Sequence, residues 1–257
     1  NRATHDRGRK LMTTSICLWS GPRNVSTALM YSFAQRDDVR VVDEPLYGHY
    51  LRVSGADHPG RDDIIANMNC DGATVMRELL ARQERDSSVR LFQKHMAHHL
   101  VDLDLGFLRE TSNIFLIRNP REMLPSLTIQ LPHASLSDTG LKRQWEIFDE
   151  LRSAGQTAVI LDSRELLLDP AGILEKLCEH LGLDFDPCML SWEPGALAED
   201  GIWAPHWYHA VHQSTGFAPF QPKGPFPDEL LELLADCKPW YDRLYENALT
   251  GSKQGEN

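Results

Sequence analysis

Residues 16–30 of the chain read Ile16-Cys17-Leu18-Trp19-Ser20-Gly21-Pro22-Arg23-Asn24-Val25-Ser26-Thr27-Ala28-Leu29-Met30, and this stretch decides the fold. It begins with an apolar run too short for a helix and continues into a turn-forming Ser-Gly-Pro-Arg-Asn segment. Ser26 and Thr27 then open an apolar-periodic segment that extends to about Gln35. The pattern predicts a strand, a tight loop and the N-terminus of a helix.

The predicted loop is suited to binding a phosphate or a sulfate. The first N–H groups of a helix lack intrahelical partners, and the helix dipole adds partial positive charge there. Arg23 contributes a fixed charge and a planar fork of donors. The nucleoside-triphosphatase pattern G-x-x-x-x-G-K-[ST] is not met, because its Gly-Lys falls on Ser26-Thr27 when counted from Gly21. An ordinary Ser-capped helix after a buried strand is the alternative interpretation.

Length and composition predict one large α/β domain. The chain has 257 residues, 42% of them hydrophobic and 25% charged, and we expect one domain over residues 12–257 with residues 1–11 as an extension ahead of it. The net charge of −11 argues against general binding to nucleic acid or to an anionic membrane. No apolar run of membrane-spanning length and no signal-peptide pattern is present, so we expect a cytoplasmic protein.

Four more strands and four helices extend the predicted fold. Strands are expected at about 40–45, 89–95, 113–117 and 157–161, and helices at about 62–85 with an interruption at 67–72, 141–154, 170–180 and 228–249. These alternating elements predict an α/β fold with a mostly parallel central sheet between helices. Glu44, His95 and Arg118 follow strands, at the sheet edge where open parallel sheets bind ligands. The stretch 191–227 is irregular, and we interpret it as a substrate lid or an unrecognised element.

Histidines gather in two places. His95, His98 and His99 follow the strand at 89–95, but Met96 stands where a zinc-binding H-E-x-x-H helix has its glutamate. We therefore expect no metal site, one histidine facing the ligand and the others at the surface or capping. A second set, His206, His209 and His212, lies among tryptophans, and we interpret it as part of an acceptor or adenine pocket rather than a metal site.

Arg118 and Ser126 form a second candidate for anion binding. Asn119 can cap the next helix and Pro120 can occupy its first position. Arg118 then leaves the strand while Ser126 lies one and a half turns into the helix, so both can close on one anionic group. Pro125 predicts a kink or a late start of this helix. Capping of the helix or pairing with an acid is the alternative role of Arg118.

These motifs together resemble those of the sulfotransferase family. Pro22-Arg23 with Ser26-Thr27 is similar to its 5′-phosphosulfate loop, Pro-Lys-Ser-Gly-Thr-Thr, and Arg118 with Ser126 is similar to its 3′-phosphate motif. The run from Val159 through Asp169-Pro170 to Leu181-Gly182-Leu183 resembles the family's strand, "DP" turn and helix. Lys94-His95 resembles the K-x-H strand end of the cytosolic branch with one spacer missing. The matches run from Ile16 to Leu183 in family order.

The resemblance implies a P-loop-like three-layer fold, 3′-phosphoadenosine 5′-phosphosulfate as donor, and in-line sulfuryl transfer without a metal. It assigns donor binding to the following residues: Gly21, Pro22, Arg23, Asn24, Val25, Ser26, Thr27, Arg118 and Ser126. Arg23 would also stabilise charge on the leaving 5′-phosphate. For the general base we favour His95 over Glu44, because neighbouring Lys94 keeps the ring neutral. Other branches use a glutamate at an early strand end, which Glu44-Pro45 resembles.

The acceptor is expected to be a small molecule. A net charge of −11 disfavours a polyanionic glycan, and the aromatic-rich stretch 203–226 indicates a partly apolar alcohol, phenol or amine. Two other functions remain open: a nucleotide-kinase-like phosphotransferase, which the missing loop lysine disfavours, and a non-catalytic nucleotide-binding module of the same fold.

Overall fold

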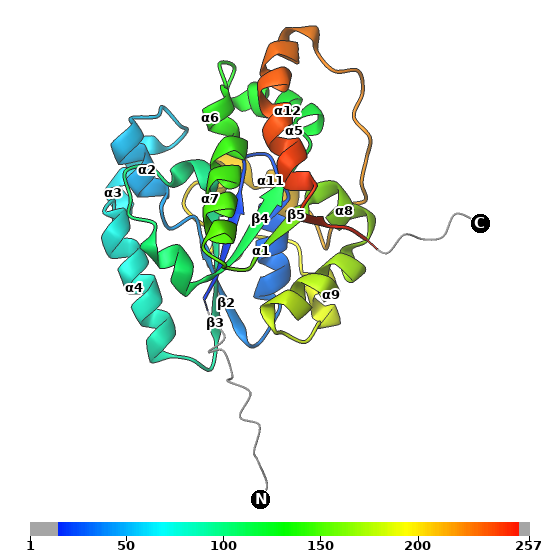
Figure 1. The fold of residues 1–257 in the computed structure, drawn as a ribbon. Helices are drawn as coiled ribbons and strands as arrows, with labels where there is room; N and C mark the ends of the chain where they lie inside the picture. Colours follow the sequence, from blue (N-terminus) through cyan, green and yellow to red (C-terminus); the bar gives the residue numbers. More distant parts are fainter. Residues whose placement is uncertain (1–14, 252–257) are drawn as a thin grey trace, which may run out of the picture.

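Six strands form the sheet at the centre of the protein (Figure 1). The computed structural model describes residues 15–251. The strands are β1 (Ile16–Ser20), β2 (Val39–Asp43), β3 (Arg90–Met96), β4 (Ser112–Ile117), β5 (Ala158–Asp162) and β6 (Ala248–Leu249). Their order across the sheet is β2-β3-β1-β4-β5-β6, and each neighbouring pair among the described residues is parallel. The predicted α/β fold with a parallel sheet is confirmed.

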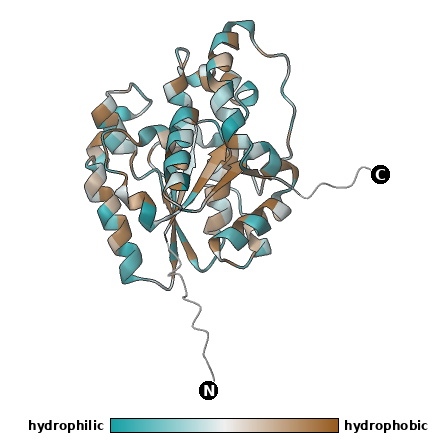
Figure 2. Cartoon of the chain, in the orientation of Figure 1, coloured by the Kyte–Doolittle hydropathy of each residue, from teal (hydrophilic) through white to brown (hydrophobic). Residues whose placement is uncertain are grey.

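Helices surround the strands. They are α1 (Ser26–Ala34), α2 (Tyr47–Ser54), α3 (Arg61–Asn67), α4 (Gly72–Arg85), α5 (Pro120–Gln130), α6 (Leu136–Thr139), α7 (Leu141–Ser153), α8 (Ser163–Leu168), α9 (Pro170–Leu181), α10 (Ala204–Trp207), α11 (His209–His212) and α12 (Leu231–Tyr245). Short 3₁₀ turns are η1 (Ala97–His99), η2 (Gly106–Glu110), η3 (Pro187–Leu190) and η4 (Asp228–Leu230). Figure 2 shows the strands as predominantly hydrophobic and the surrounding helices as mixed.

The alternation of side chains along β1 separates two cores. Ile16 and Leu18 join a cluster with α1 and α9, whereas Cys17 and Trp19 join a cluster with α5, α7 and α12. Side chains of this size contribute about 1.5–3 kcal/mol each when fully buried. A strand that is apolar on both faces can satisfy both clusters only between two layers of helices. The sheet is therefore the middle of three layers, as the resemblance implied.

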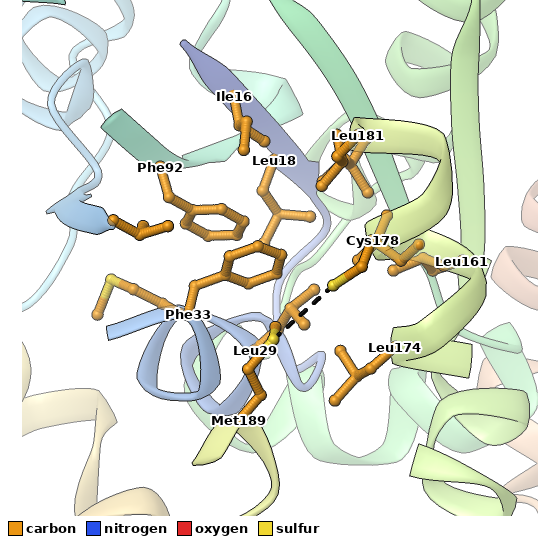
Figure 3. Packing of buried hydrophobic residues seen from close by; sticks show 14 of the residues in the cluster. Ile16, Leu18, Leu29, Phe33, Phe92, Leu161, Leu174, Cys178, Leu181 and Met189 are labelled. Atoms are coloured by element: carbon orange, nitrogen blue, oxygen red, sulfur yellow. Dashed lines mark hydrogen bonds between the residues drawn. The ribbon is translucent and has the colours of Figure 1, made fainter. Parts of the chain in front are cut away.

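Figure 3 shows the first core at close range. The rings of Phe33 and Phe92 stack with centroids 4.2 Å apart, joining α1 to β3. Where α9 and η3 join this core, the sulfur atoms of Cys178 and Met189 lie 3.8 Å apart. The cysteines described by the structure are free thiols. This packing fixes α1, and with it the loop that precedes α1, against the sheet.

Some boundaries differ from the predictions. The interruption at 67–72 is confirmed, because α3 ends at Asn67 and α4 begins at Gly72. The helix α5 begins at Pro120 and contains Pro125, so the expected late start is wrong. The last helix ends at Tyr245, and the following β6, which pairs with β5, was not predicted. The irregular stretch 191–227 contains the one-turn helices α10 and α11.

The predicted extension 1–11 lies outside the described residues, and the single domain over 12–257 stays a prediction. Among residues 15–251, no helix has the length and apolar character needed to cross a membrane.

Candidate active site

A cleft of about 730 Å³, open to solvent, lies where β1, β2 and β3 end. It is lined by Pro22, Arg23, Asn24, Ser26, Thr27, Glu44, Tyr47, His58, Lys94, Met96, His98, His99, Leu127, Leu131, Asp138, Trp203, Trp207 and Tyr208. This position, beyond the carboxyl ends of parallel strands, is the one predicted for the ligand site.

The loop between β1 and α1 has a fixed conformation. The Asn24 side chain donates to the Leu116 carbonyl at 2.9 Å and accepts from the Val25 N–H at 2.8 Å. A Cβ on Gly21 would lie 2.5 Å from the Thr139 carbonyl oxygen, so only glycine fits there. These contacts hold the loop between β4 and α6.

The first turn of α1 leaves its donors available to a ligand. No side chain among residues 15–251 caps the helix, and its first turn contains no acidic residue. Ser26 and Thr27 begin the helix and line the cleft. Because the first N–H groups of a helix lack intrahelical partners, this end can receive an anion.

Arg23, Arg118 and Ser126 meet beside this loop. The Nε atom of Arg23 donates to Oγ of Ser126 at 3.0 Å, and Nη1 of Arg118 donates to the carbonyl oxygen of Arg23 at 2.6 Å. Arg118 also lies 3.7 Å from the Glu122 carboxylate and lines a smaller cavity of about 180 Å³ next to Gly21. Arg23 thus contacts both Arg118 and Ser126, neither of which lines the cleft itself, and their binding of one anionic group stays a prediction.

The charge of Arg23 is uncompensated within residues 15–251. Its guanidinium is half-buried, and its side-chain hydrogen-bond partner in that range is the neutral Ser126 hydroxyl rather than a carboxylate. Burial lowers the pKa of Arg23. Its backbone φ is 53°, in the left-handed region that non-glycine residues rarely adopt. A partly desolvated cation held in a strained conformation is typical of a site that receives an anionic ligand.

A buried ion cluster forms the next part of the cleft. The fully buried Lys94 donates from Nζ to Asp43 at 2.9 Å, to Glu44 at 2.6 Å and to the Tyr208 hydroxyl at 2.6 Å. Tyr208 in turn donates to Asp43 at 2.8 Å and accepts from the Trp203 indole at 3.0 Å. We call Asp43, Glu44, Lys94 and Tyr208 the lysine cluster.

Burial sets the protonation of the lysine cluster. It raises the pKa of Glu44, and the Lys94 charge opposes that rise only in part. For Lys94, burial acts to lower the pKa, but the two adjacent carboxylates outweigh it and raise the pKa above its ordinary value. Glu44 has a φ of 38°, a second strained residue at the cleft. A carboxylate with a raised pKa at the ligand edge is suited to accept a proton near neutral pH.

The structure contradicts the prediction that His95 faces the ligand. Successive side chains of a strand point to opposite faces, so His95 points away from the cleft that Lys94 lines. His95 stacks on Trp19 at 4.3 Å, and its Nε2 lies 3.2 Å from the Gln93 side chain. The ring is fully buried, and burial, with a smaller effect of Lys94, lowers its pKa to about 3. Because the spacer of the K-x-H pattern is missing, Lys94 and His95 are adjacent in β3, and their side chains lie on opposite faces of the sheet.

Other histidines take the place expected for His95. His98 and His99 line the cleft, so the expectation that they are surface or capping residues is wrong. The second set is also corrected: His206 and His209 are exposed, and His212 contacts Asp200 at 2.9 Å, while none of the three lines the cleft. Within the described chain, no group of three or more His, Cys, Asp or Glu residues is arranged to hold a metal ion.

The sequence associates the aromatic-rich stretch 203–226 with the acceptor, but it does not single out the residues that form the aromatic wall of the cleft. Trp203, Trp207 and Tyr208 come from the stretch interpreted as a lid, and the N–H of Gly201 donates to Asp43 at 3.0 Å. The richness of this stretch in tryptophan and tyrosine was the available signal. Its partners on β2 and β3 could not be read from the sequence, because irregular backbone carries no periodicity.

The fold and the cleft define the class of protein. The sulfotransferase domain model matches residues 14–248, so the chain belongs to the sulfotransferase domain family. It shares the fold of the sulfotransferase domain from the curacin biosynthetic pathway, with a TM-score of 0.50, 15% identity, and coverage of 87% of this chain and 96% of that one. A sulfotransferase from Alicyclobacillus acidocaldarius gives a TM-score of 0.50, 15% identity, and coverage of 90% and 94%.

A curated relative is more similar in sequence. Branched-chain-amino-acid aminotransferase-like protein 2 of Arabidopsis thaliana is 40% identical over 231 residues. The match covers 89% of this chain but 41% of that protein. The chain therefore spans about two fifths of the length of this relative.

Proposed function

We propose that the chain transfers a sulfuryl group from 3′-phosphoadenosine 5′-phosphosulfate to a hydroxyl or amine of a small molecule. The observation that carries this proposal is the half-buried Arg23 without a carboxylate partner in the described chain, beside the uncapped N-terminus of α1 and in contact with Arg118 and Ser126. Two arginines at a helix N-terminus match a donor that carries phosphates at the 3′ and 5′ positions of its ribose.

The residues at the loop fit the donor. The segment Gly21–Thr27 offers backbone N–H groups and Arg23 to the 5′-phosphosulfate, and Arg118 with Ser126 offers donors to the 3′-phosphate. When bound, the donor supplies the sulfuryl group and leaves as the bisphosphate. Arg23 and the N–H groups of α1 then stabilise the charge that grows on the bridging oxygen. Because they also hold the phosphates in place, they set the register of the transfer.

Glu44 replaces His95 as the proposed general base. It lines the cleft, and burial raises its pKa, so the carboxylate is a stronger base than an exposed glutamate. One of its oxygens is held by Lys94. Lys94 and Tyr208 keep the carboxylate in position while the acceptor hydroxyl or amine gives up its proton.

The acceptor lies against aromatic side chains in this proposal. Trp203, Trp207 and Tyr47 supply apolar area, and Leu127 and Leu131 add to it. Such walls favour a small, partly apolar acceptor over an extended glycan. Arg23 and Lys94 are the arginine and lysine side chains that line the cleft. Arg23 binds the donor in this proposal, and Lys94 is paired with Asp43 and Glu44, so no free cationic groove remains there for a polyanion.

The test is transfer of radiolabelled sulfate from the donor to a panel of phenols, alcohols and amines. We expect transfer by the wild-type protein, and a loss of about 10²-fold or more in Arg23→Ala, because Arg23 stabilises the transition-state charge. The matched control is Arg109→Ala, an exposed arginine outside the cleft, which should keep full activity. Phosphoryl transfer from labelled ATP, with none from the phosphosulfate, would favour the kinase-like alternative and contradict this proposal.

A further inference from the structure

Three histidines form one wall of the cleft and are not used by the proposed transfer. We call His58, His98 and His99 the histidine wall; all three line the cleft. Tyr47 and Tyr50 hold His99 between them, with ring centroids 4.8 Å and 4.6 Å from it. The wall is therefore a rigid stacked surface rather than a set of mobile side chains.

His98 has hydrogen-bonding capacity that the protein leaves unfilled. Its Nδ1 is buried and lacks a partner among the described residues, as does Nδ1 of His99. By contrast, Nδ1 of His58 lies 2.9 Å from the Tyr47 hydroxyl. A buried polar atom without a partner costs about 1–3 kcal/mol. Whereas His99 is stacked between two tyrosines, the ring of His98 is nearly perpendicular to its neighbours, with its centroid 4.6 Å from that of His99 and 5.2 Å from that of Tyr50.

The histidine wall is uncharged near neutral pH. Burial lowers the pKa of His98 to about 4, and the neighbouring His58 acts in the same direction. Burial also lowers the pKa of His58. A neutral imidazole offers one donor and one acceptor nitrogen, so it can bind a hydroxyl, which has both.

The charged groups around the wall disfavour an anion. The carboxylates of Asp138 and Glu44 line the same cleft, and Asp138 acts on the pKa of both His98 and His58. The nearest cation of the cleft outside the donor loop, Lys94, is already committed to Asp43 and Glu44. An acceptor with its own carboxylate would meet these acids without a free cation.

From these contacts we infer that His98 binds a second hydroxyl of the acceptor, remote from the group that is sulfated. The substrate class is then an uncharged phenol or alcohol that carries a further hydroxyl. This inference rests on the proposed function, because it takes the ligand of the cleft to be the sulfuryl acceptor. It adds His98 to that function as a specificity-determining residue. His98 discriminates by pairing with a group that simpler phenols lack, since a site built to bond a hydroxyl rejects the analogue without it.

The experiment compares phenols that differ in one side group. The ligands are 4-ethylphenol, 4-(2-hydroxyethyl)phenol and 4-hydroxyphenylacetate, together with their 3-substituted isomers so that reach does not limit the result. Binding is measured by calorimetry on protein saturated with adenosine 3′,5′-bisphosphate. We expect the hydroxyethyl compound of the better-fitting isomer to bind about 3- to 10-fold more tightly than the ethyl compound. The acetate should bind more weakly than both.

Variants assign the preference to His98. In His98→Phe the hydroxyethyl and ethyl compounds should bind equally, with affinity for 4-ethylphenol within about twofold of wild type, while His98→Gln should keep part of the preference. The control is His180→Phe on α9, an exposed histidine outside the cleft. Bisphosphate affinity, unchanged in all variants, confirms that each is folded.

Three results would overturn the inference. They are a hydroxyl preference that survives in His98→Phe, tightest binding of the acetate, or a collapse of turnover with 4-ethylphenol in His98→Phe at unchanged binding, which would give His98 the proton-transfer role instead. Because the binding series needs no turnover, the absence of sulfuryl transfer would contradict the proposed function without touching this test.

Discussion

Removing the buried cation Lys94 should destabilise the protein strongly, and more at alkaline than at acidic pH. In Lys94→Met the carboxylates of Asp43 and Glu44 lose the ammonium that now lies 2.9 Å and 2.6 Å from them. Lys94 and the Asp43 side chain are fully buried, so water cannot replace the lost charge. The methionine keeps the apolar volume of the lysine stem, which separates the effect of charge from that of packing.

The structure sets the size of the loss. Removing one partner of a buried ion pair costs about 3–5 kcal/mol in the free energy of unfolding, because the remaining charge is left uncompensated. An exposed pair contributes about 0–1 kcal/mol. Lys238, whose side chain is 63% exposed beside Asp242, is the matched control, and Lys238→Met should cost no more than that.

The pH dependence follows from Glu44. Burial raises the pKa of Glu44 in the folded protein, so the native state holds this proton more tightly than the unfolded chain. The contribution of this group to stability is full below its ordinary pKa and is lost as the pH rises through the raised pKa. Without Lys94 the carboxyl pKa should rise further. The penalty of Lys94→Met should therefore be smaller at pH 5 than at pH 8.

Urea unfolding of the wild type, Lys94→Met and Lys238→Met at both pH values measures these differences. The double variant Lys94→Met with Glu44→Gln should recover at least about 1 kcal/mol at pH 8, because one uncompensated charge is removed. A Lys94→Met penalty that equals that of Lys238→Met, or one that does not change with pH, would refute the reasoning.

Three further predictions concern catalysis. Glu44→Gln should lower turnover by about 10²–10⁴-fold at nearly unchanged donor affinity, while His95→Ala should act mainly on stability because His95 fills the core beside Trp19. Steady-state kinetics at saturating donor checks both; full turnover in Glu44→Gln would contradict the assignment. Sulfuryl transfer should also persist in excess chelator, since Arg23 and helix N–H groups supply the positive charge. Loss of transfer in chelator, restored by magnesium or zinc, would contradict that view.

The local parts of the fold could be predicted because their signals are local. The apolar run before Gly21, the turn after it and the hydroxyls that open α1 each identify a strand, a loop or a helix end without reference to distant residues. That Arg118 and Ser126 lie near one another, each in contact with Arg23, could be expected from one strand end and one helical repeat. Strand β6 could not be predicted, because its two residues are too few to show an alternating pattern.

The rest of the site depends on contacts that sequence spacing does not contain. Tyr208 reaches Asp43 across 165 positions of the chain, and only the folded path of the irregular stretch brings them together. The choice of His95 as the base rests on its neighbour Lys94, which keeps the ring neutral, and not on the simple alternation of side chains along a strand. That alternation, applied to Lys94 and His95 as neighbours in β3, would have separated them correctly.

The central claim is that Arg23, Arg118 and Ser126 bind the two phosphates of the donor, and calorimetry with adenosine 3′,5′-bisphosphate and adenosine 5′-phosphate tests it most directly. We predict that the bisphosphate binds at least about tenfold more tightly, because charge-assisted hydrogen bonds contribute about 1.5–3 kcal/mol each. Arg118→Ala should abolish this preference. Equal affinity of the wild-type protein for the two nucleotides would contradict the claim.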